Sequence, residues 1–207
     1  QSTTTRNTAT TNMNVIASVV TGPTRSITLY SGYEGEEKAQ TTYNFNYDGN
    51  QIKTFTVFVY GSGTLADTLA SSATYRNTAT TNVIANVVQG PVKSTTTYVG
   101  NEGEEKAKLT LNYNYLGVYV KTSTVFTYVA DILTQSTTYR NTVTMGQVND
   151  SEKATGATPV SNLKKSITTY FGGEGEEKAL RTYNFSGDNT SIKTVTAFGY
   201  GAGILDE

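Results

Sequence analysis

The residues of this chain that are best able to do chemistry are clustered carboxylates in a motif that occurs three times. Glu-Gly-Glu-Glu-Lys-Ala stands at residues 34–39, 102–107 and 174–179. Carboxylate oxygens beside a flexible glycine are ligands that Ca²⁺ accepts, which gives six candidate metal ligands: Glu34, Glu36, Glu102, Glu104, Glu174 and Glu176. A lysine adjoins the acids in every copy, and the alternating Asp/Asn spacing of a calcium loop is missing. The motif is more typical of a charged turn on a solvated rim, where Glu and Lys discourage unwanted strand pairing.

The sequence has few of the side chains that other kinds of catalysis require. The sequence contains no histidine and no cysteine, which removes the side chain most used for proton transfer near neutral pH, thiolate metal sites and disulfides. Glu36 and Glu37 are acids of the kind that a glycosidase uses, but neighbouring residues of a strand point to opposite faces and do not converge on one sugar. We therefore expect no enzyme, no catalytic residue and no cofactor.

The charged motif belongs to a longer segment that is written three times. Residues 24–66, 92–134 and 164–206 align without a gap. Such self-similarity predicts an array of one supersecondary unit, because a single unit cannot bury its own apolar face and must stack on the next. We expect three β-repeats, at residues 1–67, 68–135 and 136–207, and an exposed polar loop over residues 146–162 of the third.

Alternating side chains predict strands inside each copy. Residues 25–30, 39–47 and 52–60 of the first copy alternate with a period of two, and the middle run places Thr41, Tyr43, Phe45 and Tyr47 on one face. Asp48-Gly49 predicts the hairpin between the last two strands, since both residues tolerate a positive φ. Valine-rich runs at residues 15–20 and 83–88 predict one further strand in the connections.

The composition favours an all-β fold of tandem antiparallel repeats that form a stacked or spiralling sheet, continuing between subunits. The chain has 15 Tyr and 7 Phe, and Thr dominates by eye; these residues suit a half-buried pleated surface. Copies stacked in register would align equivalent aromatic residues into two ladders: Tyr60, Tyr128 and Tyr200, and Phe58, Phe126 and Phe198. Each neighbouring pair would contribute roughly 0.2 to 1 kcal/mol. Ordinary core filling by the same rings is the alternative.

The two ends of the sequence resemble an internal connection of the same chain. Residues 204–207 followed by residues 1–8 closely reproduce residues 132–142, apart from one extra residue and Thr5 in the position of Tyr139. We expect either a longer repetitive polypeptide or a subunit whose ends meet head to tail, which gives an open-ended assembly. The residues expected at such a joint are Gln1, Thr5, Arg6, Leu205 and Glu207.

The arginine of a recurring Arg-Asn-Thr triplet is the remaining charged feature. Arg6, Arg76 and Arg140 occupy it, and we expect them to form ion pairs at strand ends. The net charge of −1 argues against a nucleic-acid partner, which would require a concentrated basic face. No apolar run approaches the length that spans a bilayer.

A tyrosine-rich segment carries a family resemblance. Tyr43-Asn44-Phe45-Asn46-Tyr47-Asp48-Gly49, with Ile52-Lys53-Thr54 and Val57-Phe58-Val59-Tyr60-Gly61 after it, resembles a divergent YD repeat of the Rhs type. Such repeats are strand–turn–strand units that build spiralling β-sheets in large bacterial cell-surface and toxin-shell proteins. Leu116 in the second copy and Gly187-Asp188 in the third depart from Tyr-Asp, and the period is longer than one YD unit. The resemblance therefore implies a tubular or fibrous relative at an extracellular or cell-surface location.

Together these features predict a structural protein whose partner is itself. We expect it to assemble into an extracellular filament or tube through head-to-tail and lateral β-strand packing. The alternative is a cell-surface adhesin or glycan-binding repeat module, which would stack surface glycans on exposed tyrosines and gain affinity from repetition.

Overall fold

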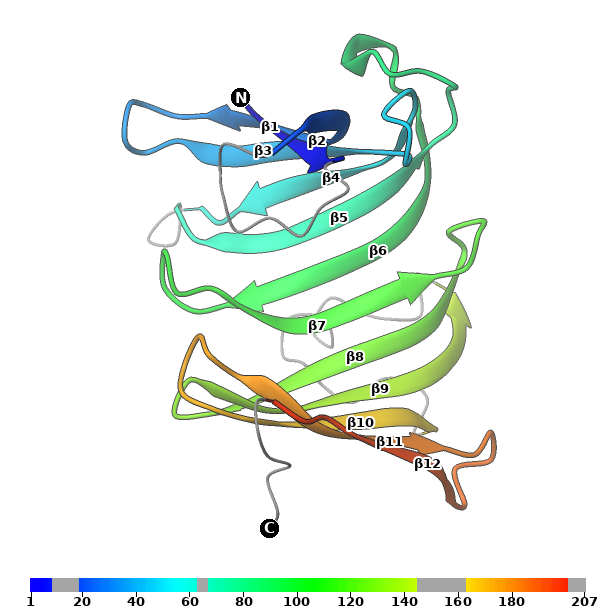
Figure 1. Cartoon of the computed structure of the whole chain (residues 1–207). Coiled ribbons are helices and arrows are strands. Elements are labelled where there is room, and N and C mark those ends of the chain that lie inside the picture. The colour runs from blue at the N-terminus through cyan, green and yellow to red at the C-terminus, as the bar shows by residue number, and fades with distance from the viewer. Residues whose placement is uncertain (9–18, 63–66, 145–162, 201–207) are drawn as a thin grey trace. The chain divides into compact units, whose positions relative to one another are not determined.

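Twelve antiparallel strands form one open sheet, in which the order across the sheet is the order along the chain (Figure 1). The computed structural model describes residues 1–8, 19–62, 67–144 and 163–200. The chain divides into two compact units, residues 1–94 and 95–207, and the division falls within strand β6. The prediction of an all-β fold is confirmed. The repeat boundaries at residues 67 and 135 stay a prediction.

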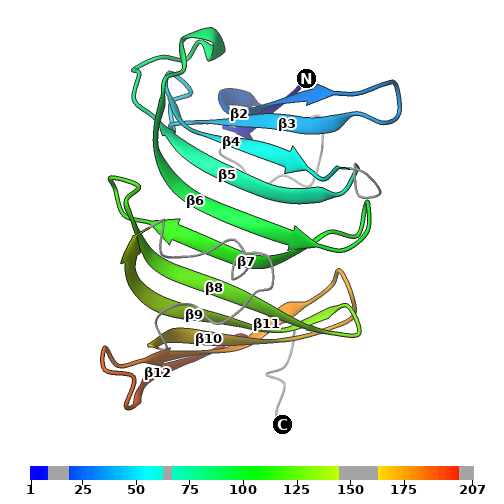
Figure 2. The ribbon, with the colours of Figure 1, turned by 180° about the vertical axis from the view of Figure 1, so that it is seen from behind.

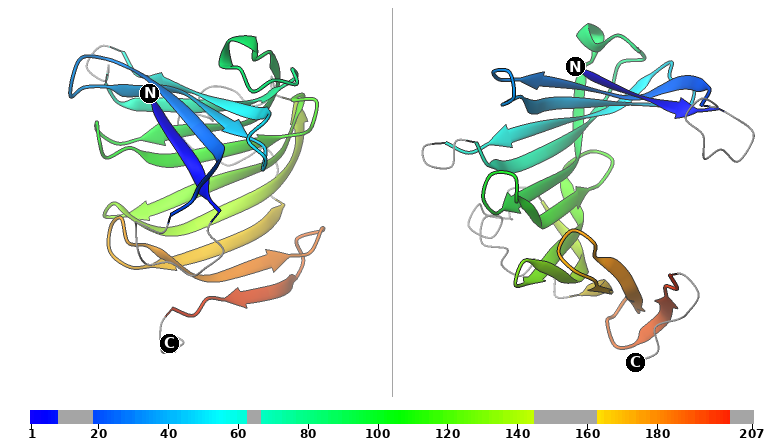
Figure 3. Two further views of the ribbon diagram at one scale, coloured as in Figure 1. Left: turned by 45° about the horizontal axis from the view of Figure 1, so that its top comes forward. Right: turned by 60° about the vertical axis from the view of Figure 1, so that its left-hand side comes forward.

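The first unit contains five complete strands and the beginning of the sixth: β1 (Ser2–Asn7), β2 (Thr21–Ser31), β3 (Lys38–Phe45), β4 (Ile52–Tyr60), β5 (Leu69–Asn77) and β6 (Gln89–Val99). The strands predicted over residues 25–30, 39–47 and 52–60 correspond to β2, β3 and β4. Among the described strands, β1 pairs only with β2, and it lies at the margin of this unit (Figure 3).

The second unit continues from β6 with six further strands: β7 (Lys106–Tyr113), β8 (Tyr119–Val129), β9 (Ile132–Thr144), β10 (Lys164–Phe171), β11 (Lys178–Phe185) and β12 (Ile192–Ala197). Strand β12 pairs with β11, and no described strand lies on its other side (Figure 2). Each aligned sequence segment thus contributes three strands. Strand β1 precedes the first segment, β5 lies between the first and the second, and β9 begins at the end of the second and continues beyond it.

Strand alternation sorts apolar and polar residues onto opposite faces in the first unit. Tyr43 lies opposite Phe55, which lies opposite Tyr75 on β5. Their rings are 6.0 and 5.5 Å apart between centroids, and Phe55 is buried. Ile52 is fully buried. The core of this unit is therefore a cross-strand row of side chains of the kind that stabilises sheets.

The second unit buries aliphatic side chains in corresponding positions. Leu109, Leu111, Tyr113 and Val120 form its buried apolar set. Ser123 of β8 is also fully buried, opposite Leu111 on one side and Tyr139 on the other. A serine can be buried here because the flanking strands cover it.

Threonine hydroxyls form a row on the opposite face. Five cross-strand pairs join their Oγ1 atoms at 2.8 to 2.9 Å: Thr28–Thr42, Thr56–Thr74, Thr96–Thr110, Thr124–Thr138 and Thr168–Thr182. The backbone register also places Thr42 opposite Thr56. Such pairs stabilise the sheet in the way that helix-surface pairs stabilise helices.

The hairpin predicted at Asp48-Gly49 is confirmed, although its turn is wider than the dipeptide. Asn46 N–H donates to the carbonyl of Gln51 at 2.8 Å, and the Asn46 side-chain oxygen accepts the N–H groups of Asn50 and Gln51 at 3.1 Å. Gly49 has a φ of 70° and is the residue that needs glycine. Asn114 and Ser186 hold the equivalent turns in the same way.

The strand predicted over residues 83–88 is wrong. Ile84–Asn86 forms a short 3₁₀ helix between β5 and β6, and Val83 and Val88 are exposed by 50% and 54%. Asn77 folds this connection back on itself, since its side-chain oxygen accepts the N–H groups of Ala79 and Val88 at 3.0 Å. Of the equivalent run at residues 15–20, residues 15–18 lie outside the described residues, as does the polar loop expected over residues 146–162.

Candidate functional site

Strand β12 exposes side chains whose counterparts in β4 and β8 are buried. Ile192 is exposed by 51%, whereas the aligned Ile52 and Val120 are exposed by 0%. Val195 is exposed by 54%, whereas the aligned Phe55 and Ser123 are buried. The cause is the strand order: β4 and β8 have a strand on both sides, and β12 pairs only with β11 among the described strands. The result is a sheet edge on which the apolar side chains of Ile192 and Val195 are exposed beside the charged Lys193.

Strand β1 is the other edge, and it is built like β9. Thr4 lies opposite Ser26, as Thr138 lies opposite Ser166 in β9 and β10. Thr5 lies opposite Thr24, as Tyr139 lies opposite Lys164. Residues Ser2 to Thr5 are exposed. Among the residues expected at a joint, Gln1, Thr5 and Arg6 therefore lie in or beside this edge strand. Leu205 and Glu207 lie outside the described residues.

The arginines of the Arg-Asn-Thr triplets donate to backbone carbonyls, a contact that the expectation of strand-end ion pairs did not include. Arg6 Nη1 donates to the Thr24 carbonyl at 3.1 Å, and Arg76 and Arg140 donate to the aligned carbonyls of Val92 and Lys164 at 2.9 and 2.6 Å. The guanidinium carries five donors in a fixed fork, so one arginine can hold several carbonyls at once. The sequence showed the recurrence of these arginines but not their acceptor.

Arg140 extends this contact across a neighbouring strand. Its Nη1 also donates to the Ser186 carbonyl at 3.2 Å, and its Nη2 donates to the Phe185 carbonyl at 3.1 Å. Phe185 is the last residue of β11 and Ser186 begins the following turn, whereas Arg140 belongs to β9. The side chain therefore spans β10 and fixes the β11–β12 turn.

The Glu-Gly-Glu-Glu-Lys motifs form the turns between β2 and β3, β6 and β7, and β10 and β11. Gly35, Gly103 and Gly175 have φ values of 83°, 79° and 78°, a region that favours glycine. The carboxylates of Glu37 and Glu105 accept the N–H groups of Gly35 and Gly103 at 3.1 and 3.0 Å. Two of these glutamates thus brace their own turn.

In the second unit the charged turn of the third copy contacts the hairpin of the second. Lys106 Nζ lies 2.6 Å from Glu174 Oε1 and 3.2 Å from Asp131 Oδ1. The Glu174 hydrogen bond is the main reason that the pKa of Lys106 is raised. Glu177 accepts the Leu133 N–H at 3.1 Å, and this bond is the main reason that the pKa of Glu177 is lowered. Two glutamates of one motif therefore hold the preceding copy.

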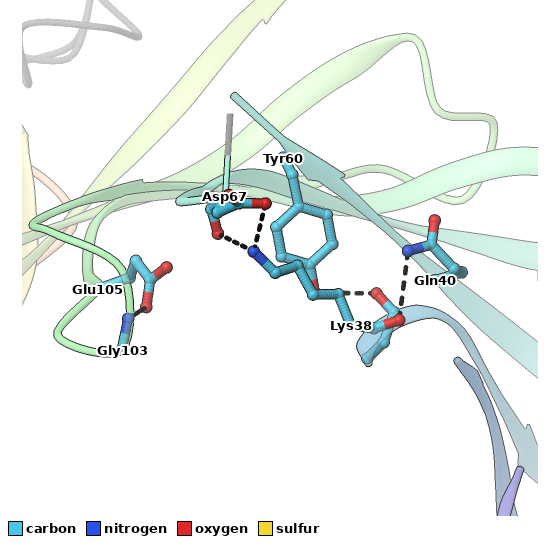
Figure 4. A network of polar contacts seen from close by, with 7 residues as sticks. Lys38, Gln40, Tyr60, Asp67, Gly103 and Glu105 are labelled. Atoms are coloured by element: carbon cyan, nitrogen blue, oxygen red, sulfur yellow. Dashed lines mark hydrogen bonds and ion pairs between the residues drawn. The ribbon is translucent and has the colours of Figure 1, made fainter. Parts of the chain in front are cut away.

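In the first unit the equivalent lysine is Lys38, which lies beside Tyr60 and Asp67 (Figure 4). Lys38 Nζ lies 2.6 Å from Asp67 Oδ1 and 5.7 Å from the centroid of the Tyr60 ring. The Tyr60 hydroxyl donates to the Ala39 carbonyl at 3.0 Å, and the amide of Gln40 donates to the Lys38 carbonyl at 3.2 Å. The lysine is thus held between a carboxylate and an aromatic face, where a cation–π contact is favourable.

The six glutamates considered as candidate metal ligands are distributed over three separate turns. Glu174 is used by Lys106. Across the described parts of the chain, no group of three or more His, Cys, Asp or Glu side chains is placed to hold a metal ion. The arrangement of these acids favours ion pairing and turn bracing over coordination of a cation.

The structure does not bring the predicted ladder tyrosines of the second unit together. Tyr128 belongs to β8 and Tyr200 follows β12, and strands β9, β10 and β11 lie between these two strands. The Tyr128 hydroxyl donates to the Ala107 carbonyl at 2.9 Å, and the Tyr200 ring packs 5.9 Å from Phe171. A ladder of equivalent rings between stacked sheets stays a prediction.

The phenylalanines of the second predicted ladder lie at the turn ends of their strands. Phe58 lies opposite Ser72, and Phe126 lies opposite Ser136 in the same register. Phe198 follows β12, donates its N–H to the Leu180 carbonyl at 3.1 Å and is partly exposed. Each of the first two residues is therefore paired with a serine of the next strand, and Phe198 has no described strand beyond it.

A pocket of about 680 Å³ opens beside the β7–β8 turn of the second unit. Tyr115 and Tyr119, both exposed, line it together with Lys121, Arg140 and Lys165. Aromatic faces next to cationic groups can stack a ring and attract negative charge. Exposed tyrosines were predicted from the sequence, whereas this grouping was not.

Comparisons of the chain with protein-family models, with curated proteins and with solved structures gave no match. In the parts of the chain that the structure describes, no helix has the length and apolar character needed to cross a membrane.

Proposed function

We propose that this chain is a structural, non-enzymatic protein of the cell exterior that assembles into a filament or tube by extending its β-sheet from copy to copy. Three tandem antiparallel β-repeats, related to the YD-repeat proteins, supply the sheet. Its partner is itself, and the charged turns form the solvated rim.

The observation that carries the proposal is the pair of exposed apolar side chains, Ile192 and Val195, on the edge strand β12. A flat, apolar strand with unpaired backbone groups is a template for another strand, and proteins that stay monomeric cover or charge such an edge. Ile192 and Val195 leave about half of their surface in water, while their counterparts are covered. Covering both would contribute roughly 1 kcal/mol each, in addition to the backbone hydrogen bonds.

Electron microscopy with one edge variant tests the proposal. The purified chain at high concentration should form uniform filaments or tubes, and Val195→Lys should abolish them, because a charge on a strand edge opposes pairing. Val59→Lys is the matched control: Val59 is equally exposed, at 50%, but its strand β4 is paired on both sides. Monodisperse monomers of the unmodified chain at every concentration would overturn the proposal.

The pocket beside Tyr115 favours a second candidate function, a surface adhesin that binds glycans. Its exposed tyrosine rings suit stacking on a sugar, and its three cationic residues suit acidic glycans. Binding on a glycan array that is lost in Tyr115→Ala would support this role. Tyr33→Ala is the control, since Tyr33 is exposed on a different turn. Absence of binding to any acidic glycan would contradict it.

A further inference from the structure

We propose that the outer edge of β12 binds β1 of a second copy of this chain, in the register that joins β4 to β5 and β8 to β9. The inference rests on the proposed self-assembly and names the two strands that meet. The contact is heterologous, because one copy contributes its β12 and the other its β1, and such contacts build open-ended assemblies.

The two edges are complementary because each lacks the partner that the other supplies. Strand β12 aligns with β4 and β8, and each of these pairs on its outer side with a strand that contains Arg-Asn. Strand β1 ends in Arg6-Asn7, as β5 ends in Arg76-Asn77. On its inner side β1 already pairs with β2 in the register of β9 with β10. The contact continues an arrangement that the sheet already contains twice.

The internal pairs fix the register of the proposed contact. Thr54 lies opposite Arg76, Phe55 opposite Tyr75 and Thr56 opposite Thr74, and the aligned residues of β8 and β9 pair identically. Transferred to the edges, this register sets Thr194 opposite Arg6, Val195 opposite Thr5 and Thr196 opposite Thr4. A slip by one residue would turn every side chain of β1 to the wrong face.

This register satisfies both faces of the edge. Thr196 and Thr4 replace Thr56 and Thr74, whose hydroxyls are 2.8 Å apart, and so extend the threonine row. On the other face Thr5 covers Val195, which has Tyr183 on its inner side and no described neighbour on its outer side. The side chain of Val195, which is exposed by 54% in a single copy, is then covered.

The charged turn supplies a second contact between the same two copies. Lys178 aligns with Lys106 and lies 5.6 Å from the centroid of the Tyr200 ring, as Lys38 lies 5.7 Å from that of Tyr60. Lys106 binds Glu174, the first glutamate of the next motif. The equivalent partner of Lys178 is Glu34 of the second copy. Lys178 and Glu34 form no ion pair within the described residues of one copy.

Disulfide mapping tests the pairing, and the absence of native cysteines makes each introduced thiol unique. One preparation carries Thr4→Cys and another Thr196→Cys; the two are mixed in a glutathione redox buffer and the cross-linked peptides are quantified by mass spectrometry. We expect the mixed disulfide to exceed each homodimer well beyond the factor of about two given by random pairing, since aligned threonine oxygens are in contact. Thr56→Cys with Thr74→Cys in one chain is the positive control for this geometry.

The control variants separate register, edge and assembly. Thr3→Cys mixed with Thr196→Cys should cross-link about ten-fold less, because Thr3 points to the other face. Thr4→Cys mixed with Thr124→Cys should not cross-link, because β8 is already paired. A dominant Thr196→Cys homodimer, or equal yields with Thr3→Cys, would overturn the inference. Filaments of the unmodified chain without the mixed disulfide would overturn this pairing alone, whereas monomers without any cross-link would overturn the proposed function as well.

Discussion

At the scale of single residues, the arginines of the Arg-Asn-Thr triplets join strands by donating side-chain hydrogen bonds to backbone carbonyls. Arg140 donates to the carbonyls of Lys164, Phe185 and Ser186 and so joins three segments. A lysine has a compact ammonium group and cannot reproduce the fork. Arg140→Lys should therefore lower the free energy of unfolding by about 2 kcal/mol, within the range for hydrogen bonds to charged groups.

Urea unfolding followed by circular dichroism measures this effect. Arg25→Lys is the matched control, since Arg25 is exposed. Equal unfolding midpoints for the two variants would show that the three carbonyl contacts contribute no stability.

Asp188 is the residue whose ionisation the fold changes most clearly. The hydroxyl of Ser186 is the main cause, with the N–H and hydroxyl of Thr190, and together they lower the pKa of Asp188 to about 2. Because this pKa is lowered, the stabilisation is present at pH values above the ordinary pKa of about 4 and is lost as the pH falls through 2. Ser186→Ala should raise the pKa of Asp188 toward its ordinary value.

A carbon NMR titration of the side-chain carboxyl of Asp188 reads this shift directly. Ser191→Ala provides the comparison, because the backbone N–H of Ser191 takes part in this turn through Ser186 and survives the substitution. A titration curve that does not move in Ser186→Ala would contradict the assignment of the cause.

At the scale of elements, the charged turn depends on two glycines for different reasons. Gly35 has a φ of 83° with open space around it, so Gly35→Ala should cost only the strain of a left-handed residue, about 1 kcal/mol. Gly32 has a φ of 136°, and a Cβ atom there would lie 2.5 Å from the Glu36 carbonyl oxygen. Gly32→Ala should therefore cost clearly more, roughly 3 kcal/mol from strain and the backbone shift together.

The two variants serve as controls for each other in thermal and urea unfolding. Equal losses of stability would mean that the close approach of Gly32 to Glu36 is relieved without cost.

Some strands of this sheet can be predicted from the alternation of apolar and polar residues, and others cannot. Residues 52–60 alternate clearly and form β4 with the same bounds. Leu69–Asn77 is mostly Ser, Thr and Ala and reads as a connection, yet it is a strand because β4 and β6 flank it. Residues 83–88 have the valines but no strand beside them in the described parts of the chain, and the side chain of Asn77 accepts the Val88 N–H instead. Residues 69–77 form a strand and residues 83–88 do not because of neighbouring segments that the sequence alone does not identify.

The candidate site could be predicted only in part, because the exposure of its residues also depends on neighbouring strands. The sequence shows the recurrence of the charged motif and of Arg-Asn-Thr. Thr5 and Arg6, which the sequence predicts at a joint, lie in the edge strand β1, and the joint itself stays a prediction. Ile192 and Val195 could not be found from their types, since the aligned residues Ile52 and Phe55 are also apolar and are buried. Their exposure follows from the position of β12 in the strand order.

At the scale of the whole molecule, the proposed joint can be tested by exchanging its charges. Lys178→Glu and Glu34→Lys each place like charges at every joint of a uniform assembly. Exposed ion pairs contribute little, so each variant should raise the concentration needed for assembly by only about two- to five-fold. Lys53→Glu is the control: Lys53 aligns with Lys193, lies in the interior strand β4, and its Nζ donates to Gln51 in the adjoining turn.

An equimolar mixture of Lys178→Glu and Glu34→Lys copies distinguishes a specific joint from a general effect of charge. When the two variants alternate, one joint carries both exchanged charges and the next carries the native Lys178 and Glu34, so no joint is repulsive. Sedimentation of the mixture should therefore show the assembly threshold of the unmodified chain.

A mixture of Lys53→Glu and Glu34→Lys copies has the same net charges and is the matched control. Lys178 is native in both of its components, so it meets the lysine introduced at position 34 wherever a Glu34→Lys copy follows, and the threshold should stay raised. Oppositely shifted net charges attract each other in both mixtures alike, so a general charge effect would restore both thresholds equally. Recovery in the first mixture alone requires that residue 178 of one copy meets residue 34 of the next.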